Sequence, residues 1–118
     1  MTGGELVWAI EPRADAWIVV PAGRVDESTA TGFGERLAQE VGAAAFAGVL
    51  RLAIDLAGID YMSSRGLRGL TLAQRRATEA GVTIVLAQPN EIMQEILAIS
   101  RYDMVFKVFD TVDQATSA

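Results

Sequence analysis

Two adjacent serines, Ser63 and Ser64, stand where the sequence changes from a short apolar run to a helical pattern. The run before them, Ile59–Met62, is typical of a short strand, and the segment after them has the spacing of an amphipathic helix. Serine hydroxyls at a helix start are held by unpaired backbone N–H groups, and the same amides and the helix dipole stabilise an anion. The corner is therefore chemically suited to carry a phosphate group.

The same two serines also fit a purely structural role. Serine is a preferred N-cap residue in helices generally, so the local chemistry alone favours a plain helix cap over a functional hydroxyl. The longer pattern around the serines changes that balance. Residues 55–70 read DLxGIxYxSSxGLRxL, where x marks positions outside the pattern.

This pattern resembles the signature of the STAS family, the domain shared by bacterial anti-sigma factor antagonists and sulphate-transporter tails. In the antagonists the usual form is D-L-S-x-V-x-x-I-D-S-S-G-L. The first of the two serines after the aspartate is phosphorylated there by a partner anti-sigma factor that is a protein kinase. Alignment on Gly66-Leu67 places the phosphoacceptor on Ser64, the family's aspartate on Ser63 and its second serine on Arg65.

The resemblance extends over nearly the whole chain. The segment GRVDEST, residues 23–29, resembles the family's N-terminal G-x-x-D element, and its aspartate is Asp26. The resemblance implies a single STAS domain over residues 1–118, with helices packed on a mixed sheet.

The sequence contains no histidine and no cysteine, which removes most enzyme chemistries. A Ser-His-Asp or Cys-His arrangement is impossible, and the commonest zinc ligands are missing. Neither a G-x-x-x-x-G-K-[ST] loop nor a G-x-G-x-x-G loop is present to bind a nucleotide. We therefore expect a binding module and not an enzyme, with no metal and no cofactor.

Charge and hydropathy narrow the class of partner. The formal net charge is −5 and Lys107 is the only lysine. This charge argues against a nucleic-acid partner, because binding to nucleic acid needs clustered basic residues.

The N-terminus has no basic segment followed by an apolar one, so no secretory signal is predicted. The apolar stretch Val41–Leu50 is too short to span a bilayer. With no cysteine to form disulfides, we expect a cytoplasmic protein without membrane insertion.

The first part of the chain predicts a strand hairpin. Residues 5–13 have the pattern of an opening strand that stops near Pro12, and Ala14-Asp15 is a plausible tight connection to a denser strand over Ala16–Ala22. Because proline removes a ladder donor, Pro21 predicts an edge or a bulge at that end.

A helix is predicted after Asp26, Ser28 and Thr29, which are all good capping residues. Its apolar residues recur every four positions up to Val41. Residues 42–48, GAAAFAG, are interpreted as a small-residue connection before a strand over Val49–Asp55. Burial is the expected state of Phe46 within this connection.

The central helix is predicted from Arg65 to Ala80, with Gly81 as its C-terminal stop. Its outer face carries several arginines, and those in the first turn oppose the helix dipole. They are either solvated charges or functional ones. On the functional interpretation Arg68, four residues after Ser64, meets a phosphate or an acidic partner surface.

The remaining sequence predicts a buried strand over Val82–Ala87 and a helix from Pro89-Asn90 to about Ser100 with a broad apolar face. A last strand is expected over Met104–Phe109, and residues 111–114 have the form of a capping box for a terminal helical turn. The alternation of strand and helix after the hairpin predicts an α/β domain with a mainly parallel sheet.

Two functional hypotheses follow. The first is an anti-sigma factor antagonist that binds an anti-sigma factor with serine kinase activity, is released when Ser64 is phosphorylated, and is reset by a phosphoserine phosphatase. The residues expected at that interface, Asp26 by resemblance alone, are Asp26, Ser63, Arg65, Gly66 and Arg68. The second is a STAS subunit that does not switch and serves as a scaffold in a signalling or lipid-transport assembly.

Overall fold

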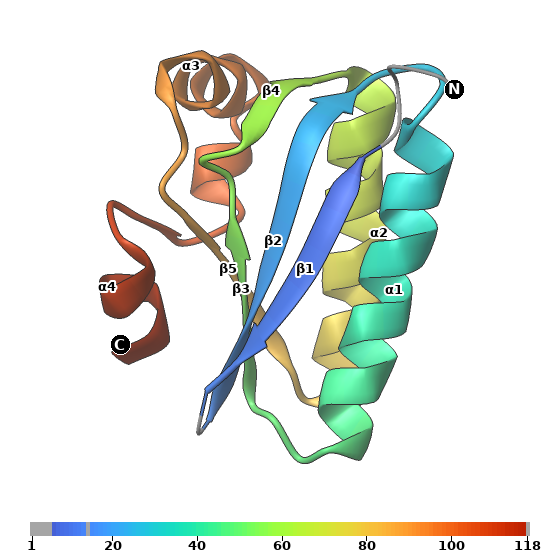
Figure 1. Cartoon of the computed structure of the whole chain (residues 1–118), viewed down its shortest axis with the longest axis vertical. Helices are drawn as coiled ribbons and strands as arrows, with labels where there is room; N and C mark the ends of the chain where they lie inside the picture. The colour runs from blue at the N-terminus through green and yellow to red at the C-terminus, as the bar shows by residue number, and fades with distance from the viewer. Residues whose placement is uncertain (1–5, 14, 118) are drawn as a thin grey trace.

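The computed structural model describes residues 6–13 and 15–117, so the predicted strand start at Glu5 and the turn residue Ala14 lie outside the described residues. Within these ranges the chain forms one α/β domain with a mixed, mostly parallel sheet (Figure 1). The elements are β1 (Val7–Pro12), β2 (Ala16–Val25), α1 (Ala30–Phe46), β3 (Arg51–Asp55), β4 (Ile59–Met62), α2 (Ser64–Ala80), β5 (Thr83–Ala87), α3 (Glu91–Ser100), the 3-10 turn η1 (Tyr102–Met104), β6 (Val108–Phe109) and α4 (Val112–Ser117).

The sheet has the strand order β1-β2-β3-β5-β6, and β4 pairs separately with β2. β1 runs antiparallel to β2, as predicted for the opening hairpin, and every other described pairing is parallel. The predicted α/β class and mainly parallel sheet are therefore confirmed.

β2 changes its partner partway along its length. Its first residues pair with β3 as far as Val19, and its last ones pair with β4 from Gly23 onward, with a register shift between Gly23 and Arg24. Pro21 lies in the interval between these two pairings, where the missing donor breaks neither parallel ladder. The expected irregularity is thus present, but the strand is central and continues to Val25, not to an edge near Ala22.

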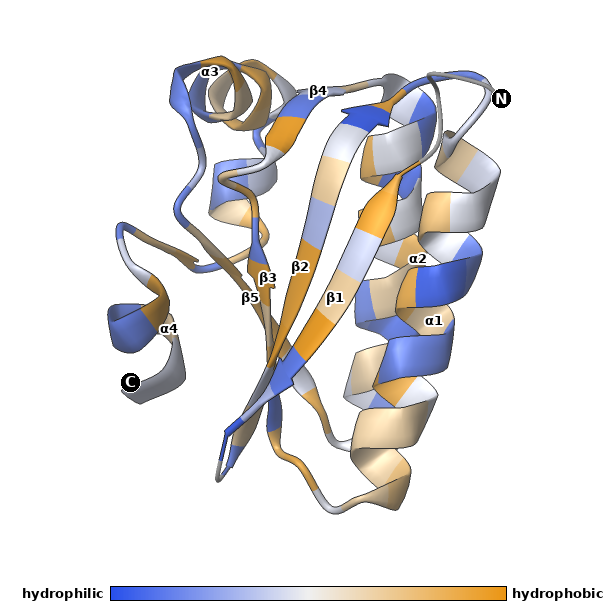
Figure 2. Ribbon diagram, viewed as in Figure 1, coloured by the Kyte–Doolittle hydropathy of each residue, from blue (hydrophilic) through white to orange (hydrophobic). Residues whose placement is uncertain are grey.

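Helices α1 and α2 lie side by side on one face of the sheet, and α4 packs against the opposite face (Figure 1). Most of the buried apolar side chains lie between these two helices and the sheet, including Phe33, Leu37, Leu70 and Ile54. Figure 2 shows the corresponding apolar stretches along the central strands. The predicted inner stripe of α2 is buried, and Gly81 ends the helix with a left-handed φ of 79°.

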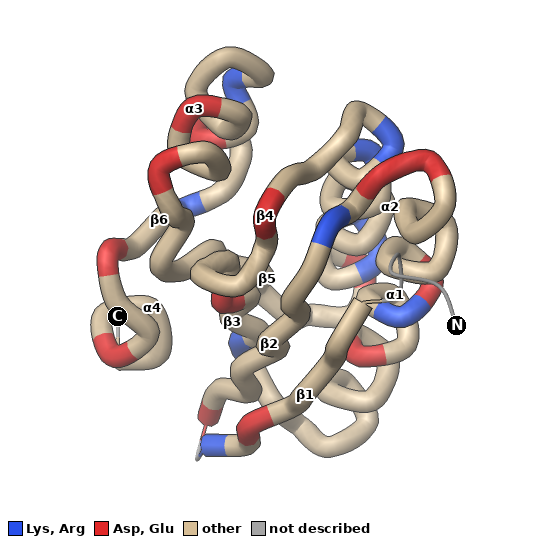
Figure 3. The backbone as a smooth tube through the Cα atoms, turned by 45° about the horizontal axis from the view of Figure 1, so that its top comes forward, with Lys and Arg blue, Asp and Glu red and all other residues tan. Residues whose placement is uncertain are grey.

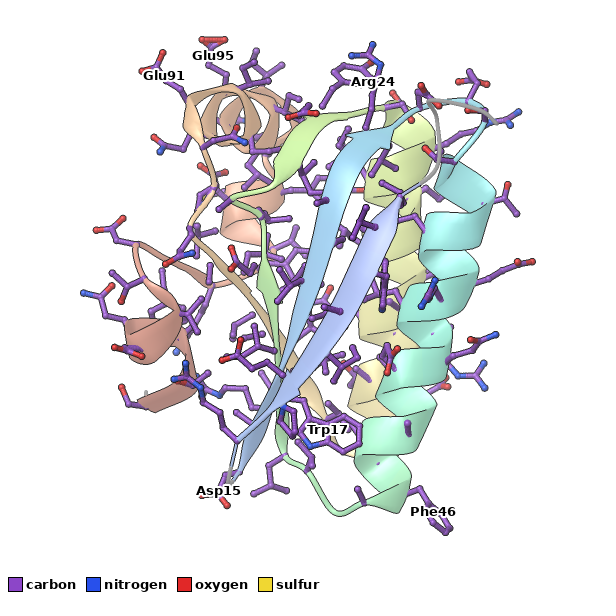
Figure 4. All side chains as sticks on the ribbon, viewed as in Figure 1. Asp15, Trp17, Arg24, Phe46, Glu91 and Glu95 are labelled. Atoms are coloured by element: carbon purple, nitrogen blue, oxygen red, sulfur yellow. The ribbon has the colours of Figure 1, made fainter. Side chains whose placement is uncertain are left out.

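The end of α1 and the exposure of Phe46 differ from the sequence expectation. α1 does not stop at Val41 but continues to Phe46, because alanine is the best helix former and the run of alanines extends the helix up to Gly48, whose φ is +76°. Phe46 is 96% exposed and points away from the end of α1 (Figure 4), so the expected burial is wrong.

The C-terminal part is less regular than predicted. Only Met93 and Leu97 of α3 are buried, whereas Ile92 and Ile99 are 55% and 82% exposed. The predicted strand at 104–109 is reduced to its last two residues, since the chain before it forms η1. The predicted cap of the terminal helix is confirmed, because the Thr111 hydroxyl accepts a 3.0 Å hydrogen bond from the Gln114 N–H.

Candidate partner-binding corner

The ends of β2 and β4 and the start of α2 meet at one corner of the domain. The backbone N–H of Ser63 donates a 2.8 Å hydrogen bond to the carbonyl of Val25. This bond brings the two sequence motifs, residues 23–29 and residues 55–70, against each other although they are far apart in the chain. Arg24, at the end of β2, marks this corner at the top of Figure 4.

Ser63 is the N-cap of α2. Its backbone is extended, with φ −77° and ψ 172°, and its hydroxyl accepts a hydrogen bond of 3.3 Å from the Gly66 N–H. The residue is only 8% exposed. Ser63 therefore has the capping role that serine favours at this position.

Ser64 occupies a different environment from its neighbour. It is the first residue of α2, it is exposed, and within residues 6–13 and 15–117 no hydrogen-bond partner is found for its hydroxyl. Ser63 is thus the buried capping residue, and Ser64 is the exposed one. The family resemblance placed the phosphoacceptor on Ser64, and the structure places the N-cap of α2 at Ser63.

Asp26 organises the connection between β2 and α1. Its carboxylate accepts hydrogen bonds from the Ser28 hydroxyl at 2.8 Å and from the Ser28 N–H at 3.0 Å. These bonds, followed by a weaker one from Thr29 and the charge of Arg24, lower the pKa of Asp26 below its ordinary value. Asp26 therefore holds the shape of the loop beside the serine corner as an ionised group. Thr29 does not cap α1 through its side chain, since its hydroxyl oxygen accepts the Asp26 N–H at 2.9 Å and its proton is donated to the carbonyl of Arg24 at 2.7 Å.

Two residues of the corner were missed by sequence reasoning. The Arg24 guanidinium lies over the ring of Tyr61, 4.3 Å from its centroid, and forms a 3.5 Å ion pair with Asp26. Arg24 and Tyr61 are register partners in the β2–β4 pairing. The position of Arg24 inside the G-x-x-D segment could have indicated that it belongs to the corner. Its contact with Tyr61 could not be predicted, because it depends on the pairing of β2 with β4.

The first turns of α2 present two arginines. Arg65 forms a 3.6 Å ion pair with Glu27, so it closes against the β2–α1 connection. Arg68 is exposed and makes no ion pair with any other described residue. Figure 3 shows basic positions at the start of α2 beside the acidic connection between β2 and α1. Ser64 and Arg68 are one helical turn apart and therefore neighbours on the helix surface.

Gly66 lies beneath the surface of the corner. A Cβ at this position would lie 2.6 Å from Val25 Cγ1 and 2.6 Å from Met62 Cγ. Because real carbon atoms do not approach so closely, only glycine allows the start of α2 to pack on the ends of β2 and β4. Gly66 therefore shapes the corner from within, while Asp26, Arg65 and Arg68 reach its surface.

A groove of about 630 Å³ runs between α1 and α2 from this corner. Its depth is set by a close approach of the two helices, where a Cβ on Gly69 would lie 3.2 Å from the Cα of Gly34. Arg65 and Arg68 line its end near the corner, and Leu72 lies farther along it. The corner and the groove form one continuous surface.

The described ranges contain no cluster of three or more acidic side chains that could hold a metal ion. None of the helices in those ranges has the length and apolarity needed to cross a membrane.

Comparison with known proteins supports the resemblance seen in the motifs. The STAS domain family model matches residues 8–115. The protein BtrV of Bordetella bronchiseptica, named for a proposed role as an anti-sigma factor antagonist, is 30% identical over 84 residues, covering 71% of this chain and 72% of BtrV.

Solved structures show the same fold. An anti-sigma factor antagonist from Mycobacterium paratuberculosis matches with a TM-score of 0.76 and 22% identity, covering 98% of this chain and 95% of that one. The Bacillus cell fate determinant SpoIIAA in its phosphorylated form matches with a TM-score of 0.64 and 15% identity, covering 93% of this chain and 96% of that one.

Proposed function

The chain belongs to the STAS domain family, and we propose from this premise that it is an anti-sigma factor antagonist switched by phosphorylation of Ser64. One observation carries the proposal. Ser64 is exposed and stands next to a separate N-cap serine, so modification of its hydroxyl does not remove the cap of α2. The relative named as an anti-sigma factor antagonist points to the same class of function.

The proposed mechanism is local. A phosphate adds about −1.5 to −2 charges at neutral pH, and a helix N-terminus tolerates negative charge. Phosphorylation therefore leaves the domain folded and acts on the contact surface, where Asp26, Ser63, Arg65, Gly66 and Arg68 form or support the partner site around Ser64. The unphosphorylated protein binds the anti-sigma factor, and the phosphorylated protein is released.

The proposed partners follow from this cycle. They are an anti-sigma factor with serine kinase activity, which binds and modifies the protein, and a phosphoserine phosphatase, which restores it. The protein and these two partners act in the cytoplasm. The protein itself contributes a surface and a hydroxyl acceptor, not catalysis.

The test compares three variants, Ser63→Ala, Ser64→Ala and Ser64→Asp. The serine-kinase anti-sigma factors of the source organism are purified and incubated with each variant and ATP, and phosphate incorporation is located by mass spectrometry. We expect Ser63→Ala to be labelled and Ser64→Ala to remain unlabelled. Ser64→Asp should stay folded but bind the anti-sigma factor more weakly than the wild type. A labelled Ser64→Ala variant would contradict the assignment, and an unlabelled wild type that binds a transporter subunit stably would favour the scaffold role.

A further inference from the structure

The groove between α1 and α2 carries charge of the opposite sign to the rest of the protein. The chain has a formal net charge of −5, whereas the charged residues that line the groove are three arginines and two glutamates. Two of those arginines, Arg68 and Arg76, make no ion pair with any other residue in the described ranges. Three arginines and two glutamates give the lining a formal charge of +1, and the remaining residues of the chain therefore sum to −6. Glu35 and Glu79 also make no ion pair with a described residue, so the positive charge is local to Arg68 and Arg76 on the α2 side of the groove.

The residues on the α2 side of the groove form one stripe along the helix. Positions 65, 68, 72, 76 and 79 recur at three- or four-residue spacing, and all five line the groove. At the centre of the stripe lies Leu72, which is 47% exposed although it is large and apolar. The floor beside it is formed by small residues, among them Gly34, Ala38 and Gly69. An apolar strip is thus flanked by arginines.

The groove also has a direction. α1 and α2 both begin at the serine corner and run side by side toward the opposite end of the domain (Figure 1). Their positive N-terminal dipole ends and the side chains of Arg65 and Arg68 lie at the corner end, while Glu79 lies in the last turn of α2. The two helices are each 17 residues long, or about 25 Å. The groove therefore favours a partner segment of helical length whose acidic end lies at the corner.

We infer that this groove, on the proposed function, receives an amphipathic helix of the anti-sigma factor that runs antiparallel to α2. Apolar side chains of that helix pack on Leu72, and carboxylates near its C-terminal end pair with Arg65 and Arg68. A carboxylate one turn from the Leu72 contact, toward the N-terminal end of the partner helix, pairs with Arg76. Phosphate on Ser64 repels the acidic end of this helix, so the switch acts on a contact surface that extends well beyond the corner.

The experiment uses each purified serine-kinase anti-sigma factor of the source organism and measures its affinity for variants of the full chain. Leu72→Glu and Arg76→Glu test the groove. Their matched controls are Leu50→Glu, at a leucine that is 66% exposed outside the groove, and Arg75→Glu, which makes the same charge change one residue away without lining it. We expect each groove variant to weaken binding by about tenfold or more, and each control by less than about twofold. Thermal unfolding of all four variants shows whether they remain folded.

The outcomes separate this inference from the proposed function. A wild-type chain that binds none of the anti-sigma factors overturns both. Binding that Ser64→Asp weakens but Leu72→Glu and Arg76→Glu leave unchanged overturns the groove alone. Equal losses for Arg75→Glu and Arg76→Glu, removed together by added salt, reduce the effect to general charge and also overturn the groove.

Discussion

Gly66 gives the sharpest structural prediction, because the first turn of α2 packs against the ends of β2 and β4 through this residue. A Cβ at this position would lie 2.6 Å from a side-chain carbon of Val25 and 2.6 Å from one of Met62. Val25 is fully buried and β-branched, so its χ1 cannot move freely. Met62 can shift only by moving the part of its side chain closest to the backbone. Gly66→Ala must therefore displace the first turn of α2 from the sheet.

Two effects of opposite sign decide the stability of Gly66→Ala. Alanine is favoured over glycine by up to about 1 kcal/mol in a helix interior, and by less in the first turn. Adding a methyl group to a fully packed site costs about 1–3 kcal/mol. The overpacking term is larger, since two contacts are too short at once. We expect the free energy of unfolding to fall by about 1–2 kcal/mol, which lowers the melting temperature by roughly 4–10 °C.

The assay is urea unfolding followed by circular dichroism, with Gly42→Ala as the matched control. Gly42 lies inside α1 and a Cβ there would have no atom within 4 Å. The same substitution should therefore raise the free energy of unfolding there, by up to about 1 kcal/mol. If both variants change stability in the same direction, the packing argument for the corner is refuted.

Three further substitutions test the corner. Ser63→Ala removes the acceptor of the Gly66 N–H bond and should lower the free energy of unfolding by about 1 kcal/mol, whereas Ser64→Ala should change it by less than about 0.5 kcal/mol in the same urea titration. Asp26→Asn should destabilise the protein at neutral pH. The folded-state pKa of Asp26 lies below its unfolded value. The stability difference between the wild type and Asp26→Asn should therefore be fully present at pH values above the ordinary pKa of aspartate, and it should disappear as the pH falls through the folded-state pKa. Thermal unfolding of the wild type and of Asp26→Asn across the acidic pH range measures this stability difference. A difference that grows as the pH falls would contradict a lowered pKa for Asp26.

The sequence predicted best where a local pattern matches the structure it forms. The helix predicted over 65–80 is found from Ser64 to Ala80, because a regular apolar stripe, serines before it and Gly81 after it all agree. The end of α1 was misjudged because residues 42–48 are small and lack a clear apolar period, so a helix stabilised by alanine propensity resembles a linker.

Longer-range features were not accessible from the sequence. The pairing of β4 with β2, not with its sequence neighbour β3, is a non-local choice, and it alone brings Tyr61 under Arg24. The groove between α1 and α2 could likewise not be predicted from the sequence, because it depends on how the two helices pack. Arg68 and Arg76 are eight residues apart in the sequence, but both line the same groove.

The placement of Ser64 in an already formed helical turn has a consequence for any enzyme that modifies it. Protein kinases that act on flexible tails read an extended peptide, but here the residues on either side of the hydroxyl are fixed by the Ser63 cap and by the packing of Gly66. On the proposed function, we therefore expect a kinase to recognise the folded corner, which is built from separate parts of the chain. A short linear peptide covering residues 58–70 should be a poor substrate, and unfolding of the domain should abolish modification although the serine becomes more accessible.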